Sequence, residues 1–431
     1  MEYKTYKLGT CFSLIENGAI IKQRKEAKGF PITRIETLSH GKFNRDKLGH
    51  ADIFDTTPYK RYILEDKDLI MSHINSRAFL GRTVLYRKKG NEQIIHGMNV
   101  LRIKTNELFL DPVFASYLFK TSHFKKAIDS IRKDAINQSS INIFDICNIQ
   151  ISLPSITEQR KISHALQLID KKIETNHLIN DNLEAMAKQL YDYWFVQFDF
   201  PNEEGKPYKS SGGAMVWTEK LKREIPQGWH CGTLLDIAEY TNGLACQKYR
   251  PTDNNKLPVI KIKEMHDGLS ADTEWVKANI PDDVKIFDGD VLFSWSASLE
   301  VMLWAYGNGG LNQHIFKVTS KNGYPRSFYF YQLIHYVGVF KQMAEARKTT
   351  MGHITQDHLR QSTIALPPNV DITNKLEEKL CSIFDEIVKN NQEIMALTKQ
   401  RDELLPLLMN GQATVNYHLL FSFVYYLILY I

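Results

Sequence analysis

The most regular pattern of apolar and polar positions lies between Ser155 and Trp194. Stepping alternately by four and three residues from Ile162 reaches ten positions. Eight of these are apolar, and the positions between them are mostly charged or polar. No proline or glycine interrupts the stretch. Such spacing over more than four heptads is typical of a helix that packs along a coiled-coil seam. At about 1.5 Å per residue, this helix would be about 50 Å long.

The same pattern recurs from Leu376 to Leu408, and a shift of 214 residues places Asn176 on Asn390. A polar residue at a seam position lowers stability and fixes the register of the paired helices. Its repetition favours two helices that pair within one chain over an ordinary amphipathic core helix. The predicted seam residues are Ile162, Leu166, Ile169, Ile173, Asn176, Leu183, Leu190, Leu376, Leu380, Ile383, Ile387, Asn390, Leu397 and Leu404.

The segments that precede the two helices also resemble each other. They contain short apolar runs separated by turn residues, as expected of mixed domains with strands. Corresponding runs are Phe30–Ile35 and Leu257–Ile262, Asp68–Ser72 and Asp290–Ser294, and Leu153–Pro154 and Leu366–Pro367. Around Val113–Lys133 the apolar spacing becomes helical. The chain is therefore predicted to be an internal duplication, in which a mixed domain and a long helix occur twice.

The duplication suggests domain boundaries. We expect a first domain at 1–154, a long helix at 155–200, a linker at 201–224, a second domain at 225–367, a second helix at 368–411 and an apolar extension at 412–431. The thirteen near-continuous apolar residues at Leu419–Ile431 are too few to span a bilayer, which needs about 20. They could pack on the protein body or be an extension without a role. We expect no membrane association.

Charge and cysteine content refine the picture. Residues 1–150 hold 25 Lys/Arg and 16 Asp/Glu, whereas residues 226–366 hold 14 of each. This excess of positive charge describes either a solvated surface or a domain that meets an acidic partner such as nucleic acid. The five cysteines are scattered and form no CxxC pair, which argues against a disulfide scaffold or a structural zinc site. Because the first residues do not resemble a signal peptide, we expect a cytoplasmic protein.

The sequence contains only incomplete matches to known catalytic motifs. Asp111–Phe114 resembles the loop with which adenine methyltransferases grip a flipped base, but it lacks the second proline and suits a helix start better. Glu65–Lys67 has the charge order of a nuclease metal site, but no Pro-Asp pair precedes it at usable spacing, so we interpret it as surface. No phosphate-binding loop and no metal-ligand spacing is present in the sequence. Ser155 or Thr157 is the expected N-cap of the first long helix.

Several phrases resemble one known family, the specificity (S) subunits of type I restriction-modification systems (HsdS). They are the helix entry Leu153–Ile162, the central block Asn182–Gly213, the domain opening Ile225–Trp229 and the helix end Leu404–Gln412. The resemblance extends over almost the whole chain, to about Val415. It implies an α+β protein with two mixed α/β target-recognition domains in tandem, whose long helices pair as an antiparallel coiled coil.

The resemblance also implies a function. Such a subunit reads a bipartite site in double-stranded DNA, one half with each recognition domain, and is not itself catalytic. It binds two methyltransferase subunits and two motor-nuclease subunits. The cofactors S-adenosylmethionine, ATP and Mg are therefore expected on those partners, and none on this chain. The alternative is a non-catalytic coiled-coil scaffold whose DNA binding is incidental.

Candidate DNA contacts were chosen because Arg, Lys, Asn and Gln read base edges, and basic and hydroxyl side chains bind phosphates. In the first domain they are Lys22, Arg24, Lys25, Ser72, Asn75, Arg77, Arg132, Lys133, Asn137, Gln138 and Ser139. In the second they are Lys248, Tyr249, Arg250, Ser294, Trp295, Ser296, Arg347, Lys348, Thr349 and His353. Each alone is as well explained by a solvated surface. A further aromatic cluster at Tyr193–Phe198 is expected to pack against the second domain or to lie near a partner-binding surface.

Overall fold

The structure is a computed structural model that describes residues 2–21, 28–134, 138–270, 272–296, 298–346 and 354–415. The chain forms two compact units. Unit 1 comprises residues 1–171 and 399–431, and unit 2 comprises residues 172–398. Each unit contains a mixed domain and a stretch of both long helices. None of the helices in the described part of the chain is long and apolar enough to cross a membrane.

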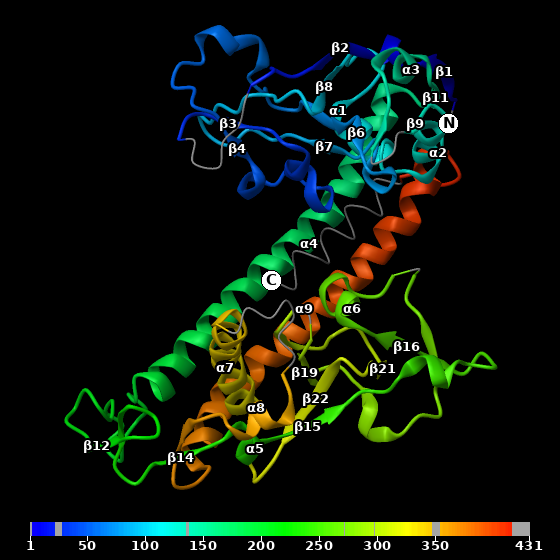
Figure 1. Cartoon of the computed structure of the whole chain (residues 1–431). Helices are drawn as coiled ribbons and strands as arrows, with labels where there is room; N and C mark the ends of the chain where they lie inside the picture. Colours follow the sequence, from blue (N-terminus) through cyan, green and yellow to red (C-terminus); the bar gives the residue numbers. More distant parts are fainter. Residues whose placement is uncertain are drawn as a thin grey trace. The chain divides into compact units, whose positions relative to one another are not determined.

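The core of unit 1 is an antiparallel sheet in the order β2-β8-β5-β7 (Figure 1). Its strands are β2 (Phe12–Asn17), β8 (Val100–Thr105), β5 (Leu69–Ser72) and β7 (Thr83–Leu85). β5 is buried along its whole length, as expected of a central strand with β-branched and apolar residues. Helices α1 (Pro112–Leu118), α2 (Ser122–Ser130) and α3 (Ile143–Asn148) contribute Phe114, Phe124 and Ile146 to the same hydrophobic core.

Three smaller pairings complete unit 1. β1 (Lys4–Lys7) lies antiparallel to β11 (Gln150–Leu153), and β3 (Pro31–Ile32) to β4 (Gly49–His50). The third sheet has the order β6 (Ile74–Asn75), β10 (Ser139–Ser140) and β9 (Lys133–Asp134). It joins two segments that lie more than sixty residues apart in the chain, because Asn75 is opposite Ser139. This third sheet carries candidate contacts from both segments.

Unit 2 repeats the central sheet of unit 1. Its order is β15-β22-β19-β20, with β15 (Ala238–Asn242), β22 (Ile315–Ser320), β19 (Val291–Ser294) and β20 (Glu300–Leu303). β19 stands where β5 stands in unit 1, which confirms the predicted correspondence of Asp68–Ser72 and Asp290–Ser294. Helix α7 (Arg326–Ala346) adds Phe328, Tyr331 and Leu333 to the core.

The remaining elements of unit 2 surround this sheet. A second sheet has the order β17-β16-β21-β18, formed by β17 (Trp275–Lys277), β16 (Lys256–Ile260), β21 (Gly309–Leu311) and β18 (Lys285–Ile286). Two further pairs are β12 (Met215–Thr218) with β13 (Arg223–Pro226), and β14 (His230–Gly232) with β23 (Ile364–Leu366). The short helices are α5 (Leu234–Ile237), α6 (Ile262–Asp267) and α8 (Gln356–Arg360). The β14–β23 pair corresponds to β1–β11 of unit 1.

The long helices are α4 (Ile156–Tyr191) and α9 (Asp371–Met409). Within each unit they run side by side in opposite directions (Figure 1). In unit 1, Arg401 of α9 donates to Asp170 of α4 at 2.9 Å. In unit 2, Asn180 donates to Asn391 at 2.9 Å. The predicted antiparallel pair of helices is therefore observed, and all fourteen predicted seam residues are buried or half-buried.

Side-chain caps mark the starts of several predicted helices. Asp111 caps α1 by accepting a hydrogen bond from the Phe114 amide at 2.8 Å, which confirms the helix start. Ser155 Oγ accepts from the Glu158 amide at 3.3 Å and caps α4. The helical stretch predicted around Val113–Lys133 is two helices, because Thr121 begins a new one with its own side-chain cap.

The aromatic cluster after α4 lies in the core of unit 2. Trp194, Phe195 and Phe198 are buried, and Phe195 and Phe198 contact Trp229 with ring centroids 6.0 and 5.4 Å apart. Tyr193 is 37% exposed. The helix loosens here into a π-turn at Asp192–Val196. Of the two expectations for this cluster, packing against the second domain is the one observed.

Candidate nucleic-acid interface

The small sheet β6-β10-β9 brings together candidate contacts from the two separate segments of unit 1. Asn75 on β6 donates to Ser72 Oγ at 3.1 Å and lies opposite Ser139 on β10. Ser139 Oγ donates to Asp134 on β9 at 2.6 Å. Ser72 and Ser139 are buried, so their hydroxyl groups serve this internal network. The sheet thus links the two segments of unit 1 through hydrogen bonds of Asn75 and Ser139.

Arg132 is held by two carboxylates. Its guanidinium donates to both oxygens of Asp134, at 2.6 and 3.0 Å, and to Asp129 at 2.6 Å. The side chain is 13% exposed. The hydrogen bonds from Arg132 and then from Ser139 lower the pKa of Asp134 to about 2. A phosphate contact by Arg132 would require it to leave these partners, so its present geometry suits a brace better than a DNA contact.

Three of the other candidates in unit 1 face solvent. The Arg77 side chain is 70% exposed and lies 3.9 Å from Asp129, while Lys133 and Gln138 are exposed. Lys133 is the first residue of β9 and directly follows Arg132. Because Lys133 is exposed and Arg132 is held by carboxylates, Lys133 can contact a phosphate more readily than Arg132. Arg77, Lys133 and Gln138 are the side chains of this group that can reach a ligand without rearrangement.

The candidates in unit 2 divide in the same way. Lys248 and Arg250, in and after the 3-10 turn Cys246–Tyr249, are exposed. Ser294 is buried, accepts from the Glu300 amide at 3.2 Å and donates to the Ser298 carbonyl. Ser296 is buried as well. The candidates Lys22, Arg24, Lys25, Asn137, Arg347, Lys348, Thr349 and His353 lie outside the described residues.

Trp295, which directly follows β19, packs near His314 and Phe316 of unit 2. Its ring lies 5.9 Å from that of Phe316 and 5.7 Å from that of His314, between centroids. It is half-buried, and its backbone carbonyl accepts from the Ile354 amide at 3.0 Å. Together with Ser294 and Ser296, it closes the end of β19 and leaves little polar surface there.

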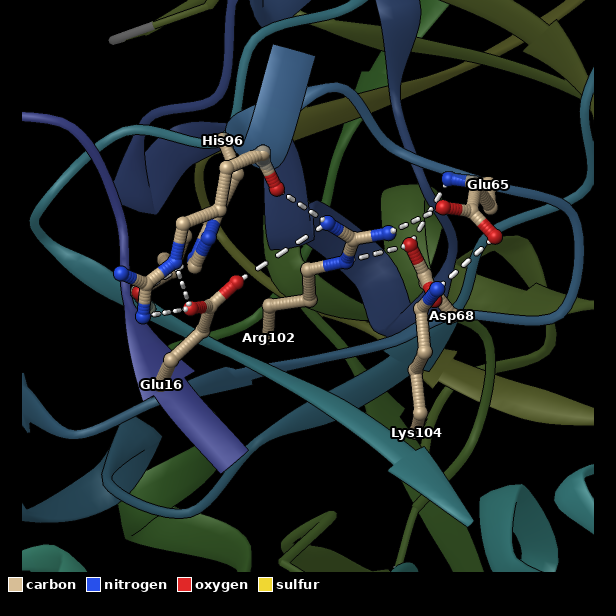
Figure 2. A network of polar contacts seen from close by, with 8 residues as sticks. Glu16, Glu65, Asp68, His96, Arg102 and Lys104 are labelled. Atoms are coloured by element: carbon tan, nitrogen blue, oxygen red, sulfur yellow. Dashed lines mark hydrogen bonds and ion pairs between the residues drawn. The ribbon is translucent and has the colours of Figure 1, made fainter. Parts of the chain in front are cut away.

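Unit 1 contains a buried ionic network that was not predicted from the sequence. Arg102 in β8 is 2% exposed; its Nε donates to Asp68 at 2.7 Å and its Nη1 to the Arg61 carbonyl at 2.8 Å. Figure 2 shows its guanidinium between Asp68, Glu65 and Glu16. Breaking a buried ion pair leaves an uncompensated charge and is strongly destabilising. The network therefore fixes β2, β5 and β8 relative to one another.

Unit 2 contains a simpler version of this network. Lys317 in β22 lies 2.9 Å from Asp290 and donates to the Lys285 carbonyl at 2.8 Å. Asp290 and Asp68 each accept a hydrogen bond from the backbone amide three residues earlier, those of Phe287 and Glu65. In each unit, a basic residue on β8 or β22 pairs with the aspartate that directly precedes the neighbouring strand, β5 or β19. This pair is therefore part of the duplicated scaffold.

His96 is enclosed next to the network of unit 1. Its Nε2 donates to the Val100 carbonyl at 2.7 Å, which requires the proton on Nε2, and its Nδ1 has no partner among the described residues. Burial first, and then the positive charges of Arg102 and His73, lower the pKa of His96 to about 4. The ring is therefore neutral at physiological pH.

The motifs that resembled catalytic sites have structural explanations. Glu65, Asp66 and Lys67 are exposed at a turn, which confirms their interpretation as surface residues. Within the described ranges, no group of three or more His, Cys, Asp or Glu is placed to hold a metal ion. The arrangement offers exposed basic and amide side chains on short strands and turns, which is the composition of a surface that binds DNA.

Comparisons with known proteins agree with this composition. A family model described as the type I restriction modification DNA specificity domain matches residues 1–185 and 226–402. The putative type I restriction enzyme MjaX specificity subunit of Methanocaldococcus jannaschii is 28% identical over 438 residues, covering 96% of this chain and 94% of that protein. The HindI specificity subunit of Haemophilus influenzae is 23% identical over 481 residues, covering 95% and 99%.

A solved structure shares the fold. The S subunit of a type I restriction-modification system from M. genitalium superimposes with a TM-score of 0.56 at 13% identity. The match covers 94% of this chain and 96% of that one. Both repeats, and not only one domain, are therefore found in a relative of known structure.

Proposed function

This chain belongs to the family of type I restriction-modification DNA specificity proteins, and we propose that it reads a bipartite target in double-stranded DNA. Each mixed domain reads one half-site. The paired helices α4 and α9 set the length of the unread gap between the halves. The chain carries out no chemistry itself.

The observation that carries this proposal is the duplication of the recognition scaffold. Units 1 and 2 contain the same four-stranded order and a basic–aspartate ion pair at the same place in it. Arg102 and Asp68 are buried, and Lys317 and Asp290 are half-buried. Two copies of one reader in a single chain suit a target with two separate halves. A seam of buried residues between α4 and α9 suits a spacer whose length does not vary.

The exposed side chains supply plausible contacts. Lys133 and Arg77 in unit 1, and Lys248 and Arg250 in unit 2, are placed for phosphate contacts, whereas Gln138 has the donor and acceptor needed to read an adenine edge. Phosphate contacts position a protein on the duplex, and base contacts specify its sequence. We therefore assign affinity to the basic residues and selectivity to Gln138 and its neighbours.

Chemistry is assigned to partner subunits. In this proposal two methyltransferase subunits bring S-adenosylmethionine, and two motor-nuclease subunits bring ATP and Mg, in the cytoplasm. Apolar side chains exposed on α4 support the binding of a partner there: Leu178 is 58% exposed, Ile179 40% and Met186 59%. Ile179 and Met186 are seven residues apart and share one helix face. Exposed apolar patches commonly mark protein interfaces.

This interface can be tested separately from DNA binding. Ile179→Glu combined with Met186→Glu should lower co-purification with the methyltransferase subunit and leave the thermal stability of the chain unchanged. The matched control is Phe54→Glu, since Phe54 is 73% exposed in unit 1 and should not affect assembly. Normal co-purification of the double variant would place the interface elsewhere.

A second candidate function is a coiled-coil scaffold with incidental DNA binding. It is favoured by the same exposed apolar face of α4, which needs no DNA to be useful. The two functions differ in a footprint: a specificity subunit protects two short elements with a fixed gap, and a scaffold gives no fixed pattern.

The decisive experiment is sequencing of methylated adenines in the host, with and without this gene. Our proposal predicts that one motif, made of two short elements separated by a gap of constant length, loses methylation when the gene is deleted. Replacing Gln138 should change the base preference in one element only. An unchanged methylome in the deletion strain, with the partner genes expressed, would contradict the proposed function.

A further inference from the structure

The second sheet of unit 2 exposes two lysines that face each other. β16 and β17 run antiparallel, with Lys256 opposite Lys277 and Pro258 opposite Trp275. Directly opposed residues and residues two apart in a strand share one face of a sheet. Lys256, Lys277 and Trp275 therefore emerge together. The alternating residues Leu257 and Val276 point into the small core around Val259.

This arrangement is unfavourable for the protein alone. Like charges directly opposite each other in a sheet repel. Among the described residues, neither Lys256 nor Lys277 has a carboxylate within ion-pair distance. The nearby acid in the same hairpin, Glu274, is paired to Lys261 at 2.5 Å. Within the described ranges, the two lysines thus occupy directly opposed positions of the hairpin and neither has an ion-pair partner.

Aromatic rings support both ammonium groups. Lys256 Nζ lies 4.6 Å from the centroid of the Trp275 ring, and Lys277 Nζ lies 5.3 Å from that of Tyr249. Trp275 is 44% exposed although it is large and apolar. Such contacts attract a cation only weakly at exposed sites. They orient the lysines but do not neutralise them.

The neighbourhood extends the positive surface. Lys248 and Arg250 come from the turn Cys246–Tyr249, and Cys246 packs in the same small core as Val276. Between this turn and β17 lies a small hollow of about 290 Å³, lined by Gln247, Arg250 and Trp275 and also by the carboxylate-bearing Glu274. Basic groups interleaved with exposed rings are typical of surfaces that bind nucleic acid.

We propose that Lys256, Lys277, Trp275 and Tyr249 form a second DNA-binding surface of unit 2, which we call the lysine–tryptophan face. A backbone phosphate between the two ammonium groups removes their repulsion, and the Trp275 ring packs against the adjoining deoxyribose or base. This inference rests on the proposed function. It matters because residues 226–366 hold as many acidic as basic residues, so contact with DNA depends on local concentration of charge.

Stability and affinity should respond to these lysines in opposite directions. Lys256→Glu places opposite charges across the strands, so it should raise the unfolding temperature while weakening DNA binding. Lys256→Ala with Lys277→Ala should leave the unfolding temperature unchanged or raise it. The double variant should also flatten the slope of log K against log salt by up to about 1.8 units, because each neutralised phosphate contributes about 0.9. A purely structural role for the lysines predicts loss of stability instead.

The measurement uses the full chain with its methyltransferase subunit and a fluorescent duplex that contains the methylated motif of the host. Anisotropy titrations at several salt concentrations give affinity and slope. Trp275→Ala should weaken binding several-fold without changing the slope, since the ring carries no charge. The control is Lys375→Ala with Lys379→Ala on the exposed side of α9, which should alter neither quantity.

Three results would overturn the inference. The double lysine variant could bind the motif with wild-type affinity and slope, in which case the face contacts something other than DNA, such as an acidic protein. Both lysine variants could be destabilised, which would show that the lysines hold the sheet together. The wild-type complex could fail to bind any duplex, and then the proposed function fails as well. The last result is distinguished from the first because it concerns the unmodified protein.

Discussion

A layer of asparagines in the seam of unit 2 offers a quantitative test of the helix pair. Asn390 Nδ2 donates to Asn180 Oδ1 at 2.9 Å, and Asn180 Nδ2 donates to Asn391 at 2.9 Å. Asn180 and Asn390 are each 5% exposed. We predict that Asn180→Leu and Asn390→Leu each destabilise unit 2, and that the double variant recovers the loss.

The magnitude follows from the geometry. A single replacement leaves the other amide buried without its partner, which costs about 1–3 kcal/mol. Asn391 is only half-buried, so it can turn to water when Asn180 is lost. Replacing both partners removes the buried polar groups and buries two apolar side chains, which is neutral or stabilising. For a unit of this size, about 1 kcal/mol corresponds to about 2–4 °C in unfolding temperature.

Thermal and urea unfolding of the wild type, the two single variants and the double variant measure the coupling energy between Asn180 and Asn390. We expect each single variant to melt about 2–12 °C lower, because the loss is about 1–3 kcal/mol, and the double variant to melt at or above the wild-type temperature. The coupling energy should be at least about 2 kcal/mol, because two losses of at least about 1 kcal/mol are both recovered in the double variant. Additive losses in the double variant would refute a paired asparagine layer.

Three further predictions concern the spacer, the contact loop and pH. Inserting four residues after Leu183 and four before Ile387, which stand opposite in the antiparallel pair, should lengthen the gap in the methylated motif by one or two base pairs, since about 6 Å of helix is added; an unchanged gap would exclude the spacer role. Lys133→Ala should flatten the salt dependence of DNA binding by about 0.9 units, whereas Arg132→Ala should mainly lower thermal stability; the reverse outcome would make Arg132 the phosphate contact. Because the pKa of His96 is lowered to about 4 from 6.5, the unfolded state binds the proton more readily, and roughly 2–3 kcal/mol of stability should be lost as pH falls from 6.5 to 4; His96→Gln should reduce that loss, and identical pH profiles would contradict it.

The duplication and the seam were predictable because both depend on spacing along the chain. Apolar residues at alternate intervals of three and four remain recognisable without knowledge of their partners. The pairing of Asn180 with Asn390 was not predictable in the same way. The repeat places Asn176 on Asn390, but the antiparallel direction brings Asn176 to Glu393, at 2.6 Å, and Asn180 to Asn390.

Whether each candidate contact is exposed, buried or ion-paired depends on neighbouring side chains that the sequence does not identify. Arg132 and Lys133 are adjacent and look equally available for phosphate. Only the fold shows that Asp129 and Asp134 bind Arg132, whereas Lys133 is exposed and has no ion-pair partner among the residues that the structure describes. Ser72 and Ser294 were candidate DNA contacts because polar residues follow them in the sequence. Both serines are buried at the ends of their strands.

Arg102 escaped the sequence analysis for the opposite reason. A charged residue in a short strand is ordinarily expected on the exposed face, because burying a charge is costly unless it is paired. The partners Asp68, Glu65 and Glu16 come from two other segments and meet Arg102 only in the folded sheet. One signal was present: Lys317 occupies the matching strand of the second repeat, beside the matching Asp290.

This repeated basic–aspartate pair explains how one scaffold can carry two different readers. Arg102 with Asp68, and Lys317 with Asp290, fix the central strands from the buried side. The surfaces above them are then free to differ, since their residues contribute little to the core. Unit 1 presents Arg77, Lys133 and Gln138 around a small sheet, and unit 2 presents basic residues around the lysine–tryptophan face. The ionic pair of unit 1 is buried, that of unit 2 is half-buried, and the contacts are exposed, so substitutions in one reader should alter one half-site and leave the other unchanged.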